Sequence, residues 1–160
     1  MRTAIYAGAF DPITCGHLDI AERGSKMFDR VIIGIAEDSY KQTLFTLEER
    51  RTLIEAVIAH LPNVSVEIFS GLLVDFCKER QASAIIRGLR AVSDFDMELQ
   101  MALMNRQLDN SVDTVFLMSS LQYLFISSNL IKNAASVGGD ISGLVPAVVQ
   151  EALRVKYASC

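Results

Sequence analysis

The sequence predicts an α/β fold: a single Rossmann-like, doubly wound, five-stranded parallel sheet with helices on both faces. Five short apolar runs of strand length alternate along the chain with stretches of helical length. The strand-like runs are apolar without regular polar alternation, which is typical of parallel strands buried on both faces. No repeat, low-complexity tract or linker divides residues 1–160, so we expect one domain.

The first elements follow from local signals. Thr3–Ala7 is a β-prone run that ends at Gly8, and a helix is expected over Gly16–Phe28 because its apolar residues recur at helical spacing. The apolar run Val31–Ala36 has the length of a buried strand. These three segments form the first strand–helix–strand unit.

A capping box opens the next helix. The Thr46 hydroxyl can accept a hydrogen bond from the Glu49 amide while the Glu49 carboxylate reaches back to Thr46. This helix is expected to run to about His60, before Pro62.

The rest of the chain continues the alternation of strands and helices, with Gly138-Gly139 as a break between the last two helices. Further strands are expected over Val64–Phe69, Ala84–Ile86 and Val112–Met118. Further helices are expected over Leu72–Gln81, Asp94–Leu108, Ser127–Ala135 and Pro146–Tyr157.

Charge and length exclude several classes of protein. The net charge is −4 and the pI about 5.1, whereas nucleic-acid binding normally shows as a basic excess, so nucleic acid is not expected as a partner. No apolar run approaches the roughly 18 residues of a membrane helix, so no membrane association is expected. The chain enters a strand-like stretch at once, without a charged and apolar leader, which disfavours secretion.

Two compositional features bear on location and assembly. Cys15, Cys77 and Cys160 are scattered and odd in number, which is typical of free thiols in a reducing compartment, so a cytoplasmic location is expected. The hydrophobic fraction of 51% is high for a soluble monomer. Apolar interfaces in a homo-oligomer would explain this surplus, and a thick buried sheet explains part of it equally well.

The loop after the first strand is the first place to expect a ligand, because open α/β sheets bind ligands beyond the carboxyl ends of their strands. Gly8 permits a sharp turn after the strand, and Gly16 permits close approach of a ligand. His17 falls in the first helical turn, where free amides favour an anion and an imidazole can donate to a phosphoryl oxygen. Taken alone, the string is better explained as a turning loop with a capping or solvated His17.

A second basic segment follows the expected strand Ala84–Ile86. Arg87 and Arg90 are expected to leave the carboxyl end of this strand together, and guanidinium groups bind phosphate through paired hydrogen bonds. Gly88 removes a side chain where a nucleotide would pass. Without further information, a basic surface turn is an equally good interpretation.

Four motifs in this order give the chain a specific likeness. They are YAGAFDPIT at 6–14 with the T-x-G-H segment at 14–17, FTLEER at 45–50, IRGLR at 86–90 and FISS at 125–128. Over essentially its full length the chain resembles the nucleotidyltransferases, and within them the bacterial phosphopantetheine adenylyltransferases. Relatives that use nicotinamide mononucleotide or alcohol phosphates usually carry H-x-G-H, so Thr14 favours the pantetheine branch.

The resemblance implies a reaction. ATP and 4′-phosphopantetheine give dephospho-coenzyme A and pyrophosphate, the penultimate step of coenzyme A synthesis, by in-line attack without a covalent intermediate. It also implies Mg²⁺ held mainly by the ATP phosphates, so that no cluster of protein metal ligands is expected. A homohexamer and feedback inhibition by coenzyme A are further implications.

The resemblance also implies site residues, matched position by position. Catalytic roles are implied for His17, which would stabilise the transition state at the α-phosphorus, and for Lys41 and Arg90. ATP contacts are implied for Ala9, Phe10, His17, Gly88, Leu89, Arg90, Glu98, Tyr123, Leu124, Phe125, Ile126, Ser127, Ser128 and Asn129. Contacts with the acceptor are implied for Ala9, Lys41, Leu73 and Arg87.

Some residues around these positions are less usual. The chain departs from the family pattern at Ala9, Met97 and Ser136, where a hydroxyl residue, tyrosine and arginine are common. Asp94 is expected to order the arginines by ion pairing. From the sequence alone, Glu98 is more simply a solvated glutamate on its helix.

Two other interpretations stay open. One is a nucleotidyltransferase for another phosphorylated acceptor, such as nicotinamide mononucleotide. The other is a non-catalytic nucleotide-binding sensor with the same fold. A sensor would not need His17, Lys41 and the Arg87/Arg90 pair all at once, which favours an enzyme.

Overall fold

The computed structural model describes residues 1–37, 42–90 and 92–158. The strands are β1 (Thr3–Gly8), β2 (Arg30–Ala36), β3 (Val64–Phe69), β4 (Ala84–Leu89) and β5 (Asp113–Met118). The α-helices are α1 (Cys15–Met27), α2 (Leu47–Val57), α3 (Leu73–Glu79), α4 (Val92–Leu108), α5 (Ser128–Ser136) and α6 (Ala147–Ala158), with a 3₁₀ turn at Leu121–Tyr123.

The five strands form one parallel sheet in the order β3-β2-β1-β4-β5. β1 lies at the centre, where Tyr6 is aligned with Ile33 of β2 on one side and with Ile86 of β4 on the other. The chain builds outward from β1 to β3, then returns to place β4 against the free side of β1. The strand order therefore reverses between β1 and β4, and the predicted doubly wound fold is confirmed.

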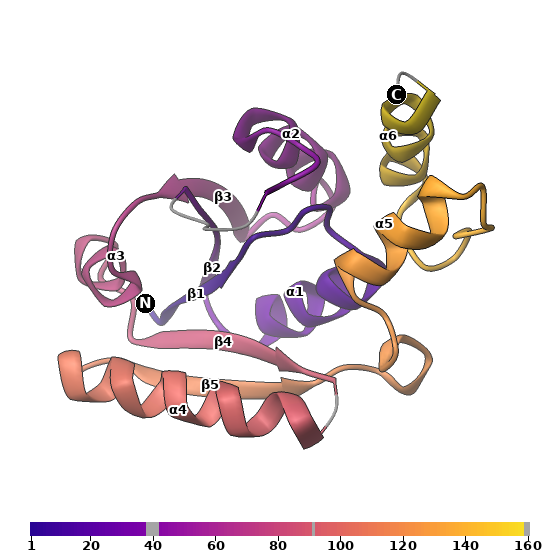
Figure 1. Ribbon diagram of the computed structural model, residues 1–160. Helices are drawn as coiled ribbons and strands as arrows, with labels where there is room; N and C mark the ends of the chain where they lie inside the picture. The colour runs from indigo at the N-terminus through magenta and orange to yellow at the C-terminus, as the bar shows by residue number, and fades with distance from the viewer. Residues whose placement is uncertain (38–41, 91, 159–160) are drawn as a thin grey trace.

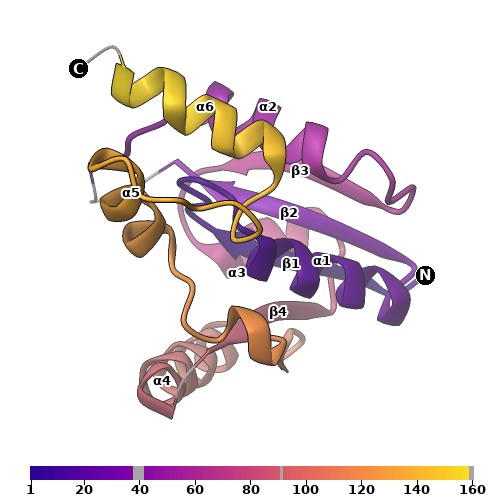
Figure 2. The same ribbon diagram turned by 90° about the vertical axis from the view of Figure 1, so that its right-hand side faces the viewer.

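Helices cover both faces of this sheet (Figures 1 and 2). α1, α2, α5 and α6 pack on one face, over a core that includes Ile20, Ile54 and Ile86. α3 packs on the other face, where its Phe76 shares a core with Ile85, and α4 contacts α3, β4 and β5. Burial of successive strand residues on opposite faces explains why the strands are apolar without alternation.

Most predicted element boundaries are confirmed to within one or two residues, and the two exceptions have local causes. The capping box is present: the Thr46 hydroxyl accepts from the Glu49 amide at 3.2 Å, and Glu49 accepts from the Thr46 amide at 2.8 Å. α2 ends at Val57 rather than His60, because the chain turns over residues 58–60. β4 runs to Leu89, because residues 87–89 pair with β5.

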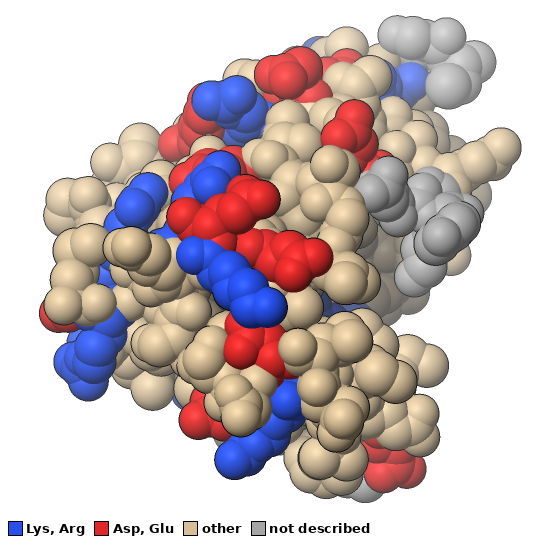
Figure 3. All heavy atoms as spheres, turned by 90° about the vertical axis from the view of Figure 1, so that its left-hand side faces the viewer, with Lys and Arg blue, Asp and Glu red and all other residues tan. Residues whose placement is uncertain are grey.

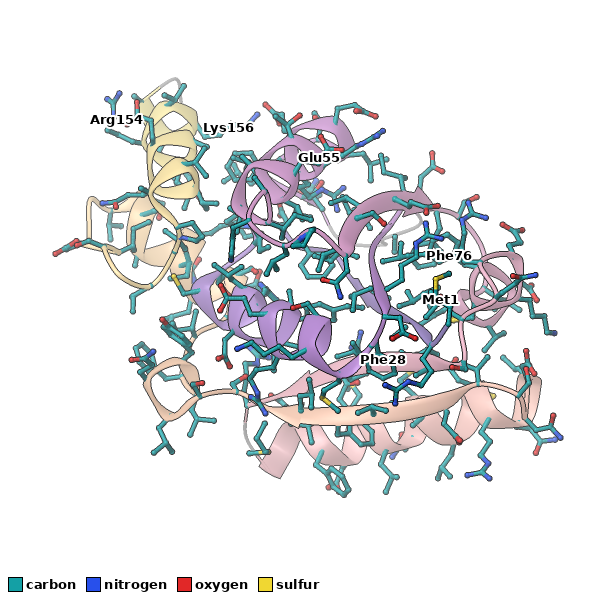
Figure 4. The ribbon with its side chains drawn as sticks, turned by 180° about the vertical axis from the view of Figure 1, so that it is seen from behind. Met1, Phe28, Glu55, Phe76, Arg154 and Lys156 are labelled. Atoms are coloured by element: carbon teal, nitrogen blue, oxygen red, sulfur yellow. The ribbon has the colours of Figure 1, made fainter. Side chains whose placement is uncertain are left out.

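The end of the chain is held against α2. Lys156 extends from α6 towards α2 (Figure 4), where its ammonium lies 2.8 Å from Glu49 and 5.5 Å from the centre of the Phe45 ring. Val149 and Leu153 of α6 are fully buried. Glu49 therefore both completes the cap of α2 and binds α6.

Charges of both signs are interspersed on the face shown in Figure 3, over the part of that face that the structure describes. Arg80 and Arg30 both pair with Glu67, at 2.6 and 3.6 Å. Among the described residues, no helix is long and apolar enough to cross a membrane.

Candidate active site

A cavity of about 330 Å³ opens where the strand order reverses, at the carboxyl ends of β1 and β4. The loop between β1 and α1, the end of β4 and the start of α5 form its walls. The predicted site residues that line it are Ala9, Phe10, His17, Arg87, Gly88, Arg90, Glu98, Tyr123, Ile126, Ser127, Ser128 and Asn129. The ligand position predicted from the topology is therefore where the predicted residues converge.

Other predicted residues lie elsewhere. Leu73 lines a second cavity of about 60 Å³, which shares Arg87 and Glu98 with the first. Leu89, Leu124 and Phe125 line neither cavity: Leu89 is buried, and 61% of Phe125 is exposed. Lys41 lies outside the described residues.

The helix start fixes the orientation of His17. Thr14 is the N-cap of α1, and His17 takes the third helical position. The Thr14 amide donates to Nδ1 of His17 at 3.0 Å, and the Thr14 hydroxyl accepts from the His17 amide at 3.3 Å. Because Nδ1 accepts this hydrogen bond, the proton of the neutral ring is on Nε2, which is then a donor.

The surroundings of His17 keep its ring neutral. Burial, followed by the positive charges of Arg90 and Arg87, lowers its pKa to about 4. At neutral pH the imidazole is therefore an uncharged hydrogen-bond donor. It is suited to stabilise an oxyanion rather than to hold a permanent ion pair.

This low pKa predicts a pH dependence of stability. As the pH falls, the unfolded chain, with a histidine pKa near 6.5, binds the proton before the folded chain does. The titration of His17 therefore has no effect on stability above about pH 7 and lowers stability progressively between pH 6.5 and 4. The full loss is at most roughly 3 kcal/mol, since His17 is partly exposed to the cavity. Urea unfolding at pH 7.5 and 5 should show a larger loss for the wild type than for His17→Gln. Equal losses would contradict the low pKa.

The backbone turn in this loop is at Phe10 rather than at Gly8. Phe10 has φ of +48°, a conformation that costs a bulky residue about 1–2 kcal/mol. Gly8 does not have positive φ, but a Cβ there would lie 3.1 Å from the Phe10 ring. Gly8 is thus needed for close packing and not, as predicted, for a sharp turn. The Phe10 ring contacts His17 edge-on, with centroids 5.1 Å apart.

Arg87 reaches the cavity from within β4, whereas Arg90 directly follows the strand. A Cβ at Gly88 would point at Ile20 of α1, 3.2 Å away, so the adjacent Arg87 projects to the opposite face, towards α4. Arg90 donates to the Ile126 carbonyl at 3.1 Å. The prediction that both leave the end of the strand together was wrong, because β4 continues through Leu89. The strand nevertheless directs both guanidinium groups to one cavity.

Each arginine has its own carboxylate. Arg87 makes two 2.6 Å hydrogen bonds to Glu98 and donates to the Ala7 carbonyl at 2.7 Å. Arg90 pairs with Asp94 at 3.2 Å, so Asp94 orders one arginine and not both. The prediction that Glu98 is simply solvated was wrong, because its side chain is only 17% exposed and binds Arg87.

Sequence reasoning missed a buried ion pair at the cavity. The Asp11 carboxylate accepts from the amides of Leu44 and Phe45, both at 2.9 Å, and from the Lys132 ammonium at 2.7 Å. Asp11 and Lys132 both line the cavity and have side chains 6% and 16% exposed. An aspartate between Phe10 and a proline was the available signal, since a buried carboxylate needs a cation.

The start of α5 forms the remaining wall. Ser127 caps the helix by accepting from the Leu130 amide at 3.1 Å, as predicted. Ser128 donates to the Pro12 carbonyl at 2.8 Å, so it ties α5 to the loop that carries His17. The cavity thus combines a helix start, the cations Arg87, Arg90 and Lys132, and a neutral imidazole donor, which is a suitable set for a chain of phosphates.

Comparison with known proteins gives the family. Residues 5–134 match the family model described as cytidylyltransferase-like. The phosphopantetheine adenylyltransferase of Moorella thermoacetica is 54% identical over 157 residues, which cover 98% of this chain and 98% of that protein. The phosphopantetheine adenylyltransferase of Alkaliphilus oremlandii is 55% identical over 157 residues, which cover 98% of this chain and all of that protein. The chain belongs to the phosphopantetheine adenylyltransferase family. Its member from Desulfatibacillum aliphaticivorans is also 54% identical, over 97% of this chain and 89% of its own.

A solved structure supports the fold. The crystal structure of a Vibrio parahaemolyticus protein assigned as a nicotinate-nucleotide adenylyltransferase superposes with a TM-score of 0.75, over 100% of this chain and 98% of that one, at 21% identity. This chain thus shares its fold with that protein. At this identity the likeness bears on the fold alone.

Proposed function

We propose that the chain transfers the adenylyl group of ATP to 4′-phosphopantetheine, giving dephospho-coenzyme A and pyrophosphate. The observation that carries this is the placement of the neutral Nε2 donor of His17 in one cavity with Arg87, Arg90 and Lys132. Identity of 54–55% with relatives of that name supports the choice of acceptor.

The geometry supports direct transfer. An oxygen of the acceptor phosphate attacks the α-phosphorus, and the bond from that phosphorus to the oxygen bridging to the β-phosphate breaks, so the electron pair leaves with pyrophosphate. His17 would donate from Nε2 to a non-bridging oxygen of the α-phosphoryl group, where negative charge gathers in the transition state. Burial raises the pKa of the Cys15 thiol, which argues against a covalent step through this cysteine.

We also propose roles for the other residues of the site. His17, Lys41 and Arg90 would act on the reacting phosphoryl group, and the other predicted residues lining the larger cavity would bind ATP. Arg87 would hold the acceptor phosphate, because it is shared by both cavities. The acceptor arm would extend into the smaller cavity, past Leu73 and Asn105, whose amide can hydrogen-bond an arm that contains amides.

Magnesium would enter as the complex with ATP. The two carboxylates that line the larger cavity together with the cations, Asp11 and Glu98, are committed to Lys132 and Arg87. These residues therefore fit an ion that is held by the phosphates, and the ion would neutralise part of the phosphate charge. Mg²⁺ should be required for turnover in the pyrophosphate-release assay described below. Full activity in the presence of a metal chelator would exclude this role.

The test of the function is pyrophosphate release from ATP with each of three acceptors. Release is expected with 4′-phosphopantetheine and not with nicotinamide mononucleotide or glycerol phosphate. Release with nicotinamide mononucleotide alone would assign the other acceptor class. Binding of ATP without release from any acceptor would favour the nucleotide-binding sensor.

We also propose a cytoplasmic homo-oligomer, a hexamer, in which residues 1–160 form one nucleotidyltransferase domain. Its support is the large apolar side chains that α4 exposes: Phe95, Met97, Leu99, Met101, Leu103, Met104 and Leu108. Such a surface is typical of subunit interfaces. Sedimentation velocity should give the mass of six chains.

We also propose feedback inhibition by coenzyme A, so coenzyme A added to the assay should lower the rate of pyrophosphate release.

A further inference from the structure

The hydroxyl of Tyr6 makes no hydrogen bond to another described residue, and Tyr6 lines the larger cavity. Tyr6 lies in β1 at the centre of the sheet and is 5% exposed. Its ring meets the Phe10 ring edge-on at 5.2 Å and lies 6.5 Å from the His17 ring. A largely buried tyrosine usually hydrogen-bonds through its hydroxyl, so the partner of this cavity-lining hydroxyl is to be sought in what the cavity binds.

The phenol belongs to the wall of the larger cavity. Tyr6 lines it together with His17, Arg87 and Arg90. The Tyr6 oxygen would lie 3.8 Å from a Cβ at Gly88, which places it beside the short backbone segment between the two arginines. Tyr6 thus lies in the part of the cavity that holds Arg87 and Arg90.

Burial keeps the Tyr6 hydroxyl protonated. Burial raises the pKa of the phenol well above its ordinary value, although the positive charges of Arg87 and Arg90 lower it. At neutral pH the hydroxyl is therefore available as a donor. A neutral donor beside two guanidinium groups and a neutral imidazole is suited to an anionic oxygen.

We propose that Tyr6 is a further substrate-contacting residue, whose hydroxyl donates a hydrogen bond to a phosphoryl oxygen of the bound nucleotide. This inference rests on the proposed function, because the nucleotide is the ligand of this cavity in that reaction. Tyr6 and His17 then supply two uncharged donors to phosphates that the arginines hold by charge. Phe10 packs between the two rings and keeps their spacing.

The test is Tyr6→Phe, which removes one oxygen and keeps the ring that packs against Phe10. A hydrogen bond to a charged oxygen is worth roughly 10- to 100-fold, so kcat/KM for ATP should fall by this factor, and the Kd of inorganic tripolyphosphate, measured by calorimetry, should rise. The KM of the acceptor and the thermal midpoint should stay unchanged. Tyr157→Phe in α6, which does not line the cavity, is the matched control and should leave kcat/KM for ATP and the Kd of tripolyphosphate unchanged.

The inference would be overturned by a Tyr6→Phe protein that binds tripolyphosphate as the wild type does. If that protein also bound adenosine more weakly, the hydroxyl would contact the nucleoside instead. If the wild type binds tripolyphosphate but releases no pyrophosphate from ATP, the proposed function fails, while the binding comparison still decides the role of Tyr6.

Discussion

His17→Ala should lower kcat by about 10²- to 10³-fold or more, with the fold retained. The variant loses the Nε2 donor that the Thr14 amide orients through Nδ1, while the other phosphate-binding groups of the cavity stay in place. Because Nδ1 also completes the cap of α1, the free energy of unfolding should fall by about 0.5–2 kcal/mol. Steady-state kinetics and urea unfolding measure the two effects separately.

A second variant separates chemistry from capping. Glutamine is a natural partner in a capping box, so His17→Gln can accept from the Thr14 amide but lacks the imidazole donor. We expect His17→Gln to recover most of the stability lost in His17→Ala and little of the activity. Near-normal turnover in His17→Ala would remove His17 from the mechanism.

Asp11→Ala should cost about 3–5 kcal/mol of unfolding free energy, because it leaves the buried Lys132 ammonium and the amides of Leu44 and Phe45 without their acceptor. This is the largest stability effect expected from one substitution in the site. The cost should appear in the denaturant midpoint. A loss below about 1 kcal/mol would mean that the ion pair is replaceable by water.

A double-mutant cycle tests whether the cost arises from the pair. Lys132→Met removes the buried charge, so the Asp11→Ala/Lys132→Met protein should lose less stability than the sum of the single variants. Lys132→Met alone should also weaken ATP binding, because it removes one cation from the cavity. Additive losses would show that Asp11 acts through the two amides alone.

The fold was predictable because its signals are local and repeated. Apolar runs marked the strands, and hydroxyl caps such as Thr46 and Ser127 marked helix starts. The end of β4 was not predictable in the same way. Arg87 and Gly88 look like turn residues, yet pairing with β5 keeps them in the strand, and this pairing is a tertiary effect.

The site was predictable where a motif and the sheet topology agreed, as for His17 and the arginines. What the sequence could not reveal is pairing between distant segments. Asp11 and Lys132 are 121 positions apart in the sequence, and Tyr6 of β1 lies beside Gly88 of the neighbouring strand β4, so these contacts arise only in the folded chain. Glu98 looked solvated because its partner Arg87 lies on another element.

The central place of β1 has a consequence for synthesis on the ribosome. As the chain emerges, β1, β2 and β3 can pair in turn, but β1 keeps one open edge until β4 emerges. During that interval the nascent chain exposes an apolar strand edge at what will become the middle of the sheet, and such edges are prone to pairing with other chains. Slower translation between residues 70 and 90 should prolong this exposure and increase the yield of aggregated chains.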